Sequence, residues 1–214
     1  MKRLAICTLI GLLSQSAWAA LDTGDQQRLA DIQQRWAVIQ YSTGAGQKAD
    51  AFEQLASQTA AFTHDRPTAA EAWIWSGIVT SSWAGAQGGL GALSKVKTAK
   101  ADLEKALSLD PTALQGSAYT SLAALYDRVP GWPVGFGDAD KAGQLLQQAL
   151  KLNPNGIDSL YFWGDHLYRQ KHYDQARAAL QKALQAPPRP GRENADAGRR
   201  QDIEALLAEL NKNT

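Results

Sequence analysis

Two arginines occupy matching positions in the chain and could hold an anion. Arg128 and Arg169 each follow a small residue, Ala123 or Gly164, by five positions. A guanidinium offers a planar fork of N–H donors that fits a carboxylate, so two of them displayed in register predict a carboxylate clamp. The alternative is that each arginine only ends the last turn of a helix, where the macrodipole favours a cation.

Aromatic and acidic residues accompany the two arginines and define a candidate binding face. Trp132 lies between the two arginines, in a stretch too rich in glycine and proline to be helical. We expect Trp132 to pack this loop back onto the helices near Trp83, so that the loop forms one wall of a groove. The candidate binding residues are Tyr126, Arg128, Trp132, Phe136, Asp158, Tyr161, Asp165, Tyr168 and Arg169. The candidate loop residues are Gly88, Gly89, Gly91, Pro130, Gly131, Gly135, Gly137 and Asp138.

Patterns typical of catalysis or metal binding are missing from the sequence. His166 and His172 are six residues apart, which does not place them on one helical face, and there is no His-Glu-x-x-His or Gly-x-Ser-x-Gly. Residues 85–91 are rich in glycine but lack the Gly-Lys-Ser/Thr of a phosphate loop. We therefore expect no catalytic residue, no metal and no cofactor, and we interpret Asp165 and His166 as ordinary surface residues.

The first residues have the order of a secretory signal peptide. A basic start at Met1–Arg3 precedes the apolar stretch Leu4–Leu13 and the small-x-small sequence Ala17–Ala19. The apolar stretch is too short to span a bilayer. This order predicts that residues 1–19 are cleaved and that the mature protein is periplasmic.

Composition restricts the partners of the mature chain. Cleavage removes Cys7, the single cysteine, and changes the formal net charge from +1 to about −1 because Lys2 and Arg3 are lost. No basic stripe remains to neutralise a phosphate backbone, which excludes nucleic acid as an expected partner. No later stretch is apolar enough to span a membrane, and the oligomeric state stays open.

One pattern, Ala-x3-Leu-x2-Ala-Leu-x3-Pro, occurs three times without a gap, beginning at Ala99, Ala142 and Ala176. Its apolar residues recur at helical spacing and its proline cannot continue a helix. The pattern predicts the helices Ala99–Leu109, Ala142–Leu152 and Ala176–Gln185.

A partner helix precedes each copy of the pattern. The stretches beginning at Trp73, Tyr119 and Leu160 are degenerate forms of the tetratricopeptide opening W-x2-L-G-x2-Y. Three such openings in register predict an all-α, tetratricopeptide-type right-handed superhelix of about four helix pairs plus a C-terminal capping helix. The expected parts are a signal peptide (1–19), an N-terminal helix pair (20–67), a repeat with a glycine-rich insertion (68–111), a repeat with a Pro/Gly/Trp loop (112–154), a regular repeat (155–190) and a cap (191–214).

Several motifs resemble a family of small exported proteobacterial tetratricopeptide proteins. The resemblance is carried by residues 85–92, 116–122, 130–138 and 187–192. Some members are TatT-type components that accompany tripartite ATP-independent periplasmic (TRAP) transporters. The resemblance implies a protein that acts by binding.

We therefore expect a non-catalytic scaffold or adaptor that binds a protein segment or a small ligand in the concave groove of the superhelix. The expected partner is a protein or peptide, for example a periplasmic solute-binding protein. Two alternatives stay open: an accessory ligand-binding component of a TRAP-type transporter, and an enzyme of a class that the sequence does not indicate.

Overall fold

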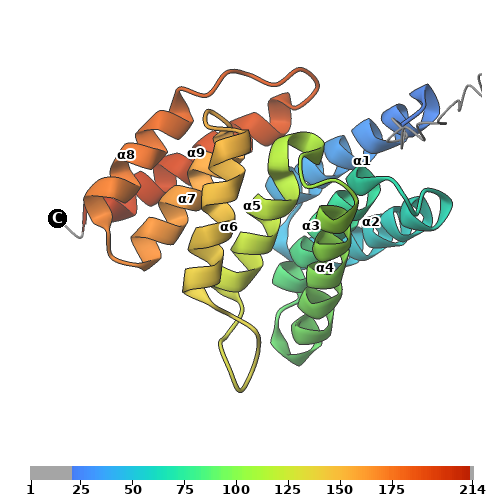
Figure 1. The fold of residues 1–214 in the computed structure, drawn as a ribbon, viewed down its shortest axis with the longest axis horizontal. Helices are drawn as coiled ribbons and strands as arrows, with labels where there is room; N and C mark the ends of the chain where they lie inside the picture. Colours follow the sequence, from blue (N-terminus) through green and yellow to red (C-terminus); the bar gives the residue numbers. More distant parts are fainter. Residues whose placement is uncertain (1–20, 213–214) are drawn as a thin grey trace, which may run out of the picture.

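The computed structural model describes residues 21–212, so the expected signal peptide at 1–19 lies outside the described residues. Within that range the chain is helical, with no strand (Figure 1). The helices are α1 (Thr23–Ser42), α2 (Ala45–Asp65), α3 (Ala70–Gln87), α4 (Gly89–Leu109), α5 (Ala113–Arg128), α6 (Ala139–Leu152), α7 (Ile157–Arg169), α8 (Tyr173–Leu184) and α9 (Glu193–Leu210). The expected all-α fold class is confirmed.

The repeated pattern folds as antiparallel helix pairs in which a small residue lets two helices touch. In the pair α7–α8, a Cβ on Gly164 would lie 2.7 Å from Cγ of Leu180. In the pair α3–α4, a Cβ on Gly77 would lie 2.6 Å from Cγ of Leu103. Both leucines are fully buried, as are the alanines four residues before them. These two repeats therefore place a glycine opposite the Ala-x3-Leu face of the following helix, where the middle repeat has Ala123.

The glycine-rich insertion does not form the irregular loop that we expected at Gly88, Gly89 and Gly91. Helix α3 continues to Gln87 and α4 begins at Gly89, so only Gly88 interrupts them, with a φ of +63°. The extra residues lengthen both helices instead. Extensive packing between α3 and α4 outweighs the low helix propensity of glycine, which amounts to only about 1 kcal/mol per residue.

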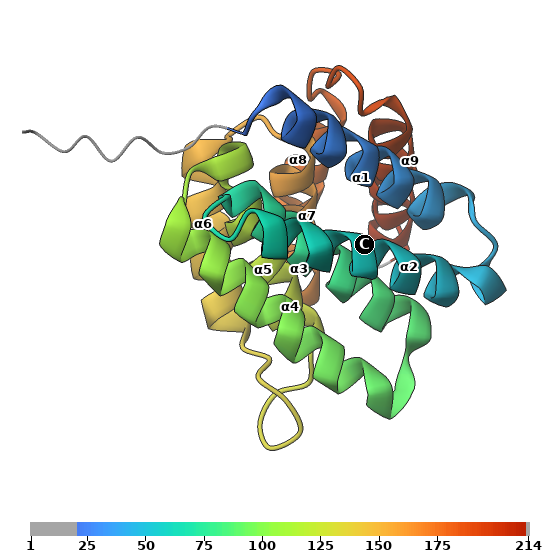
Figure 2. The same ribbon diagram turned by 90° about the vertical axis from the view of Figure 1, so that its right-hand side faces the viewer.

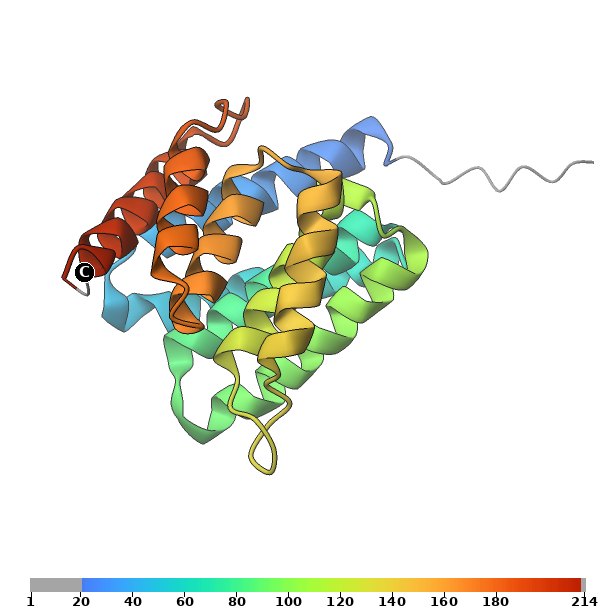
Figure 3. The ribbon, with the colours of Figure 1, turned by 60° about the vertical axis from the view of Figure 1, so that its left-hand side comes forward.

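The second insertion is a true loop, running from Val129 to Asp138 and projecting beyond the ends of α5 and α6 (Figure 3). Its base is closed by backbone hydrogen bonds: N–H of Gly137 donates to O of Pro130 (2.9 Å) and N–H of Asp138 donates to O of Tyr126 (3.0 Å). The carboxylate of Asp138 also caps α6 by accepting from N–H of Lys141 (2.9 Å).

The two ends of the superhelix meet. Helix α9 lies within the expected cap (191–214), and it packs on α7 and α8 as a cap should. It also lies beside α1, at the other end of the chain (Figure 2). The capping helix therefore closes the concave side of the superhelix as well as covering the last repeat.

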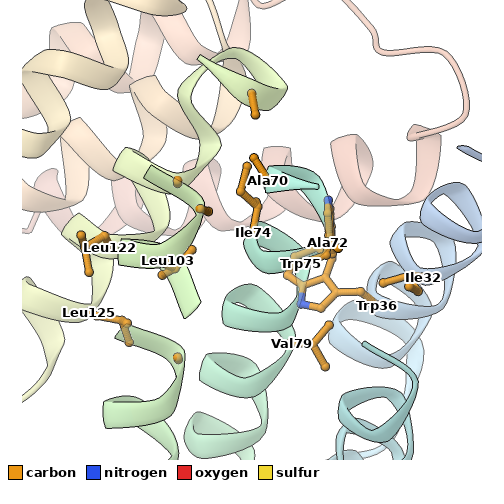
Figure 4. Close-up of a cluster of buried hydrophobic side chains, with 14 of the residues drawn as sticks. Ile32, Trp36, Ala70, Ala72, Ile74, Trp75, Val79, Leu103, Leu122 and Leu125 are labelled. Atoms are coloured by element: carbon orange, nitrogen blue, oxygen red, sulfur yellow. The ribbon is translucent and has the colours of Figure 1, made fainter. Parts of the chain in front are cut away.

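The core lies between the helix layers. Trp75 of α3 faces Trp36 and Ile32 of α1 in the larger of two buried clusters (Figure 4). The smaller cluster joins α7, α8 and α9 around Leu180 and Ile203. Contact between α1 and α3 through the two tryptophans fixes the N-terminal helix on the concave side.

Candidate functional site

A cavity of about 820 Å³ occupies the concave side. Its wall is formed by residues of α1–α5, α7 and α9, of the segment before α9 and of the loop after α5 (Val129, Pro130 and Val134), whereas α6 and α8 lie outside it. The first helices of the repeats thus face the cavity, as we expected for a concave groove. Contact between α1 and α9 adds a further wall to this space and narrows it to a partly open pocket.

Aromatic side chains form one wall of the pocket. The Trp36 and Trp75 rings meet edge to face with centroids 6.0 Å apart, and Tyr41 packs edge to face on Trp36 at 5.9 Å. Nε1 of Trp36 donates to Oγ of Ser82 (2.8 Å), which fixes the indole. Edge-to-face aromatic packing is specific in geometry, so this apolar wall is rigid.

An ion-pair network closes the pocket where α7, α9 and α1 meet. Asp158 of α7 accepts from Nη1 of Arg189 (2.7 Å) and from Nε of Arg199 (2.8 Å). Nη1 of Arg199 also donates to Asp202 (3.0 Å), which accepts from the hydroxyl of Tyr41 on α1 (3.0 Å). This chain of contacts joins the first helix to the last.

The network and its burial shift the pKa values of the groups within it. Burial by itself would raise the pKa of Asp158, but the charges and hydrogen bonds of Arg199 and Arg189 outweigh it and hold the pKa far below its ordinary value. Burial raises the pKa of the Tyr41 phenol, which keeps it a donor. The ion pairs therefore persist across the physiological pH range.

The expected pair of arginines is present, but its carboxylate comes from the chain itself. Asp165 is buried and accepts from Nη2 of Arg128 (2.8 Å) and from Nε of Arg169 (3.2 Å). The Asp165 carboxylate raises the pKa of Arg128 although burial opposes it. The Arg128–Asp165 pair therefore joins α5 to α7, whereas Arg169 pairs with Asp165 within α7, and an external carboxylate would have to displace Asp165.

Asp165 and His166 are not the surface residues that we expected. Both are buried, and Nδ1 of His166 lies 3.0 Å from both carboxylate oxygens of Asp127. Trp163 stacks on the imidazole at 5.5 Å. These residues sit between α5, α6 and α7, where they pack neighbouring repeats together.

Replacing Asp165 by asparagine is expected to lower the free energy of unfolding by about 1–2 kcal/mol, because the amide offers one acceptor to two charged donors. Denaturant unfolding measures this difference. The replacement of Glu53, an exposed residue of α2, by glutamine is the control and should have almost no effect. An Asp165→Asn variant as stable as the wild type would show that the paired arginines contribute nothing to repeat packing.

The expectation that Trp132 packs onto the helices is wrong. Its side chain is 91% exposed, at the tip of the projecting loop, and Val134 beside it is 60% exposed. Phe136 packs onto the helices instead: its ring meets the Tyr126 ring edge to face, with centroids 5.5 Å apart. The loop is tight at its base, where a Cβ on Gly137 would overlap O of Val129, so the backbone closes on itself and points Trp132 outward.

The structure places only some of the candidate residues at the pocket. Those in its wall are Gly89, Arg128, Pro130, Asp158 and Tyr161. Those outside its wall are Gly88, Gly91, Tyr126, Gly131, Trp132, Gly135, Phe136, Gly137, Asp138, Asp165, Tyr168 and Arg169.

Sequence reasoning missed the residues that come from the two ends of the chain. They are Trp36 and Tyr41 of α1, and Arg189, Arg192 and Arg199 of the C-terminal segment; Trp75 and Phe162, from the repeats themselves, were missed as well. The segment Pro187–Arg192 stood out as a motif in the sequence, but its two arginines gave no indication that they return to the concave side.

Two further properties of residues 21–212 bear on the site. They contain no group of His, Cys, Asp or Glu side chains arranged to hold a metal ion. Within the same range, no helix combines the length and apolar character needed to cross a membrane.

Residues 134–193 match the model of the tetratricopeptide repeat family. No curated protein sequence matches the chain significantly. Among solved structures, a thermophilic TPR protein of Thermus thermophilus is similar in fold, with 19% identity, a TM-score of 0.54, and 87% of this chain and 89% of that chain covered.

Two other solved structures are similar at a lower level. The structure of MamA has 16% identity and a TM-score of 0.46 over 91% of this chain and 99% of that chain. Yeast Tom70 has 19% identity and a TM-score of 0.48 over 92% of this chain and 39% of that chain. The family match and the Thermus structure, together with the repeated helix pairs, identify the fold as an all-α tetratricopeptide superhelix.

Proposed function

We propose that this protein is a non-catalytic, periplasmic tetratricopeptide protein that binds a small molecule or a protein segment in its concave pocket. The observation that carries the proposal is the concave pocket of about 820 Å³. Its size falls within the range of small-molecule sites, which are concave and mostly apolar with a few polar groups. The contact between α1 and α9 favours a small ligand, or the end of a peptide, over a long extended segment.

Binding of N-phenyl-1-naphthylamine, an uncharged fluorescent probe for apolar sites, tests the pocket. We expect saturable binding at one site per chain. Ala124 lines the cavity, so Ala124→Trp should fill it and abolish binding. Ala101 is exposed on α4, and Ala101→Trp is the matched control that should bind as the wild type does. No saturable binding, or equal binding by both variants, would overturn the proposal.

The periplasmic location has its own test. The full chain with a C-terminal tag is expected in the periplasmic fraction, with Ala20 as its new N-terminal residue, because residues 1–19 have the order of a signal peptide. A protein that keeps Met1 and stays in the cytoplasm would contradict this part of the proposal.

The projecting loop favours a second candidate, an accessory ligand-binding component of a TRAP-type transporter. A large exposed aromatic at a constrained tip, such as Trp132, is typical of a contact with another protein. The candidate requires that a solute-binding protein encoded beside this chain binds it, and that Trp132→Ser weakens this binding. Calorimetry with the two purified proteins measures this binding. Absence of binding by the wild type would reject the second candidate function.

A further inference from the structure

The charges in the pocket wall are unbalanced. Five basic residues line it, against two acidic residues, Asp158 and Asp202. Arg128 pairs with Asp165, and Arg189 and Arg199 pair with Asp158. The remaining basic residues are Lys48, whose Nζ donates to O of Gln40, and Arg192.

Arg192 is the arginine of the wall that has no carboxylate. Within residues 21–212, its guanidinium makes no hydrogen bond or ion pair, and its Nε is buried without an acceptor. It lies over the ring of Trp75, 5.1 Å from the centroid. Burial and the nearby charge of Arg189 lower the pKa of Arg192, so its cation is held in an unfavourable place.

The carboxylates of Asp158 and Asp196 act on Arg192 only through space, without a hydrogen bond, and the wall holds a second donor without a partner. Nε1 of Trp75 is also buried without a partner. A partly buried guanidinium without an anion is rare because its desolvation is not compensated. The group that would compensate it is an anion, and a carboxylate or sulfonate accepts from the guanidinium in a strong charge-assisted bond.

The remainder of the pocket wall is suited to an apolar group. Trp36 and Trp75 form the aromatic wall, and Ile78, Val96 and Phe162 also line the cavity. A ligand that places an anion at Arg192 therefore meets apolar and aromatic surface with the rest of its structure.

We propose that the pocket binds an amphipathic anion, with its carboxylate or similar anionic group on Arg192 and its aromatic or aliphatic body against Trp36 and Trp75. This proposal rests on the proposed function, since it names the ligand class of the same pocket. A free organic acid and the C-terminal carboxylate of a peptide share this chemistry.

Two probes with the same rings separate the anion preference from simple apolar binding. They are 1-anilinonaphthalene-8-sulfonate, which is anionic, and N-phenyl-1-naphthylamine, which is uncharged. Arg192→Leu is expected to weaken binding of the anionic probe about tenfold or more and to change binding of the uncharged probe less than about twofold. Arg192→Lys, which keeps the charge, should recover part of the loss.

The matched control is Arg177→Leu, which removes an arginine of α8 that lies outside the cavity wall. It should bind both probes as the wild type does. Thermal unfolding should show that Arg192→Leu is as stable as the wild type, because no ion pair is lost. A parallel loss for both probes would mean that Arg192 only shapes the pocket, and the proposal would be overturned.

Competition distinguishes the two sources of the anion. Four competitors are used to displace the anionic probe: 4-phenylbutyrate and its amide, and the peptide Ala-Ala-Phe with a free C-terminal carboxylate or with a C-terminal amide. Displacement by either acid and not by its amide supports the proposal and identifies the source. Amides that compete as well as acids contradict it but leave the proposed function intact, whereas absence of binding by both fluorescent probes rejects the proposed function itself.

Discussion

Replacing Gly198 by alanine is expected to lower the free energy of unfolding by about 2–3 kcal/mol, although alanine favours a helix over glycine by about 1 kcal/mol. A Cβ on Gly198 would lie 2.2 Å from Cγ of Tyr41 and 2.4 Å from both Cδ atoms. The ring cannot retreat, because Trp36 packs on it and its hydroxyl donates to Asp202. The added methyl group therefore separates α9 from α1, and denaturant unfolding measures the loss.

A double-mutant cycle identifies the cause. In a Tyr41→Ala background the space beside Gly198 is empty, so Gly198→Ala should have no cost or should stabilise the helix slightly. Gly46 of α2 has nothing within 4 Å of its ideal Cβ, and Gly46→Ala is the matched control. An equal cost of Gly198→Ala in both backgrounds would contradict the close contact between α9 and α1.

The Gly198→Ala variant also tests whether the contact between α9 and α1 shapes the binding pocket. If α9 moves away from α1, the pocket loses the wall that Tyr41 and Asp202 provide. Gly198→Ala should then bind N-phenyl-1-naphthylamine more weakly than the wild type, while Gly46→Ala should bind it equally. Unchanged binding by Gly198→Ala would show that the ends of the superhelix do not shape the site.

The repeat pairs could be predicted from the sequence because their determinants are local. Helices α4 and α6 end at Leu109 and Leu152, as expected, each two residues before a proline. The small residue, the alanine and the leucine of each pair lie within one repeat, so their spacing alone indicates the contact. The prediction of a loop in the glycine-rich insertion was wrong. It relied on the low helix propensity of glycine, which is a local property, whereas packing between α3 and α4 decides the structure of that segment.

The pocket between the two ends of the superhelix could not be predicted, because its contacts join distant parts of the chain. Tyr41 and Asp202 are 161 residues apart, and neither belongs to the repeated pattern. The paired arginines illustrate the same limit. Their register predicted a clamp for an external carboxylate, but a one-dimensional pattern does not show that Asp165 of the chain itself occupies them.

Replacing Asp158 by alanine is expected to lower the free energy of unfolding by about 1–2 kcal/mol, because it leaves the Arg199 and Arg189 guanidiniums without a shared acceptor. The effect is smaller than for a fully buried pair, since the Asp158 side chain is 33% exposed, Arg199 keeps Asp202 and Arg189 keeps Asp196. Denaturant unfolding at pH 7 measures it. Asp50→Ala is the control, because Asp50 is exposed on α2 and should contribute little.

The pH dependence of this difference tests whether the charge of Asp158 is the cause. The pKa of Asp158 is lowered in the folded protein, because its two arginines outweigh the effect of burial. The stability that it contributes is therefore fully present above the unfolded pKa of about 3.9 and is lost as the pH falls from there toward the folded pKa. The gap between the wild type and Asp158→Ala should stay constant from about pH 7 to pH 5 and shrink below about pH 4. A gap that does not change with acid would mean that Asp158 stabilises the fold by packing, and that its ion pair with Arg199 is not what holds α7 to α9.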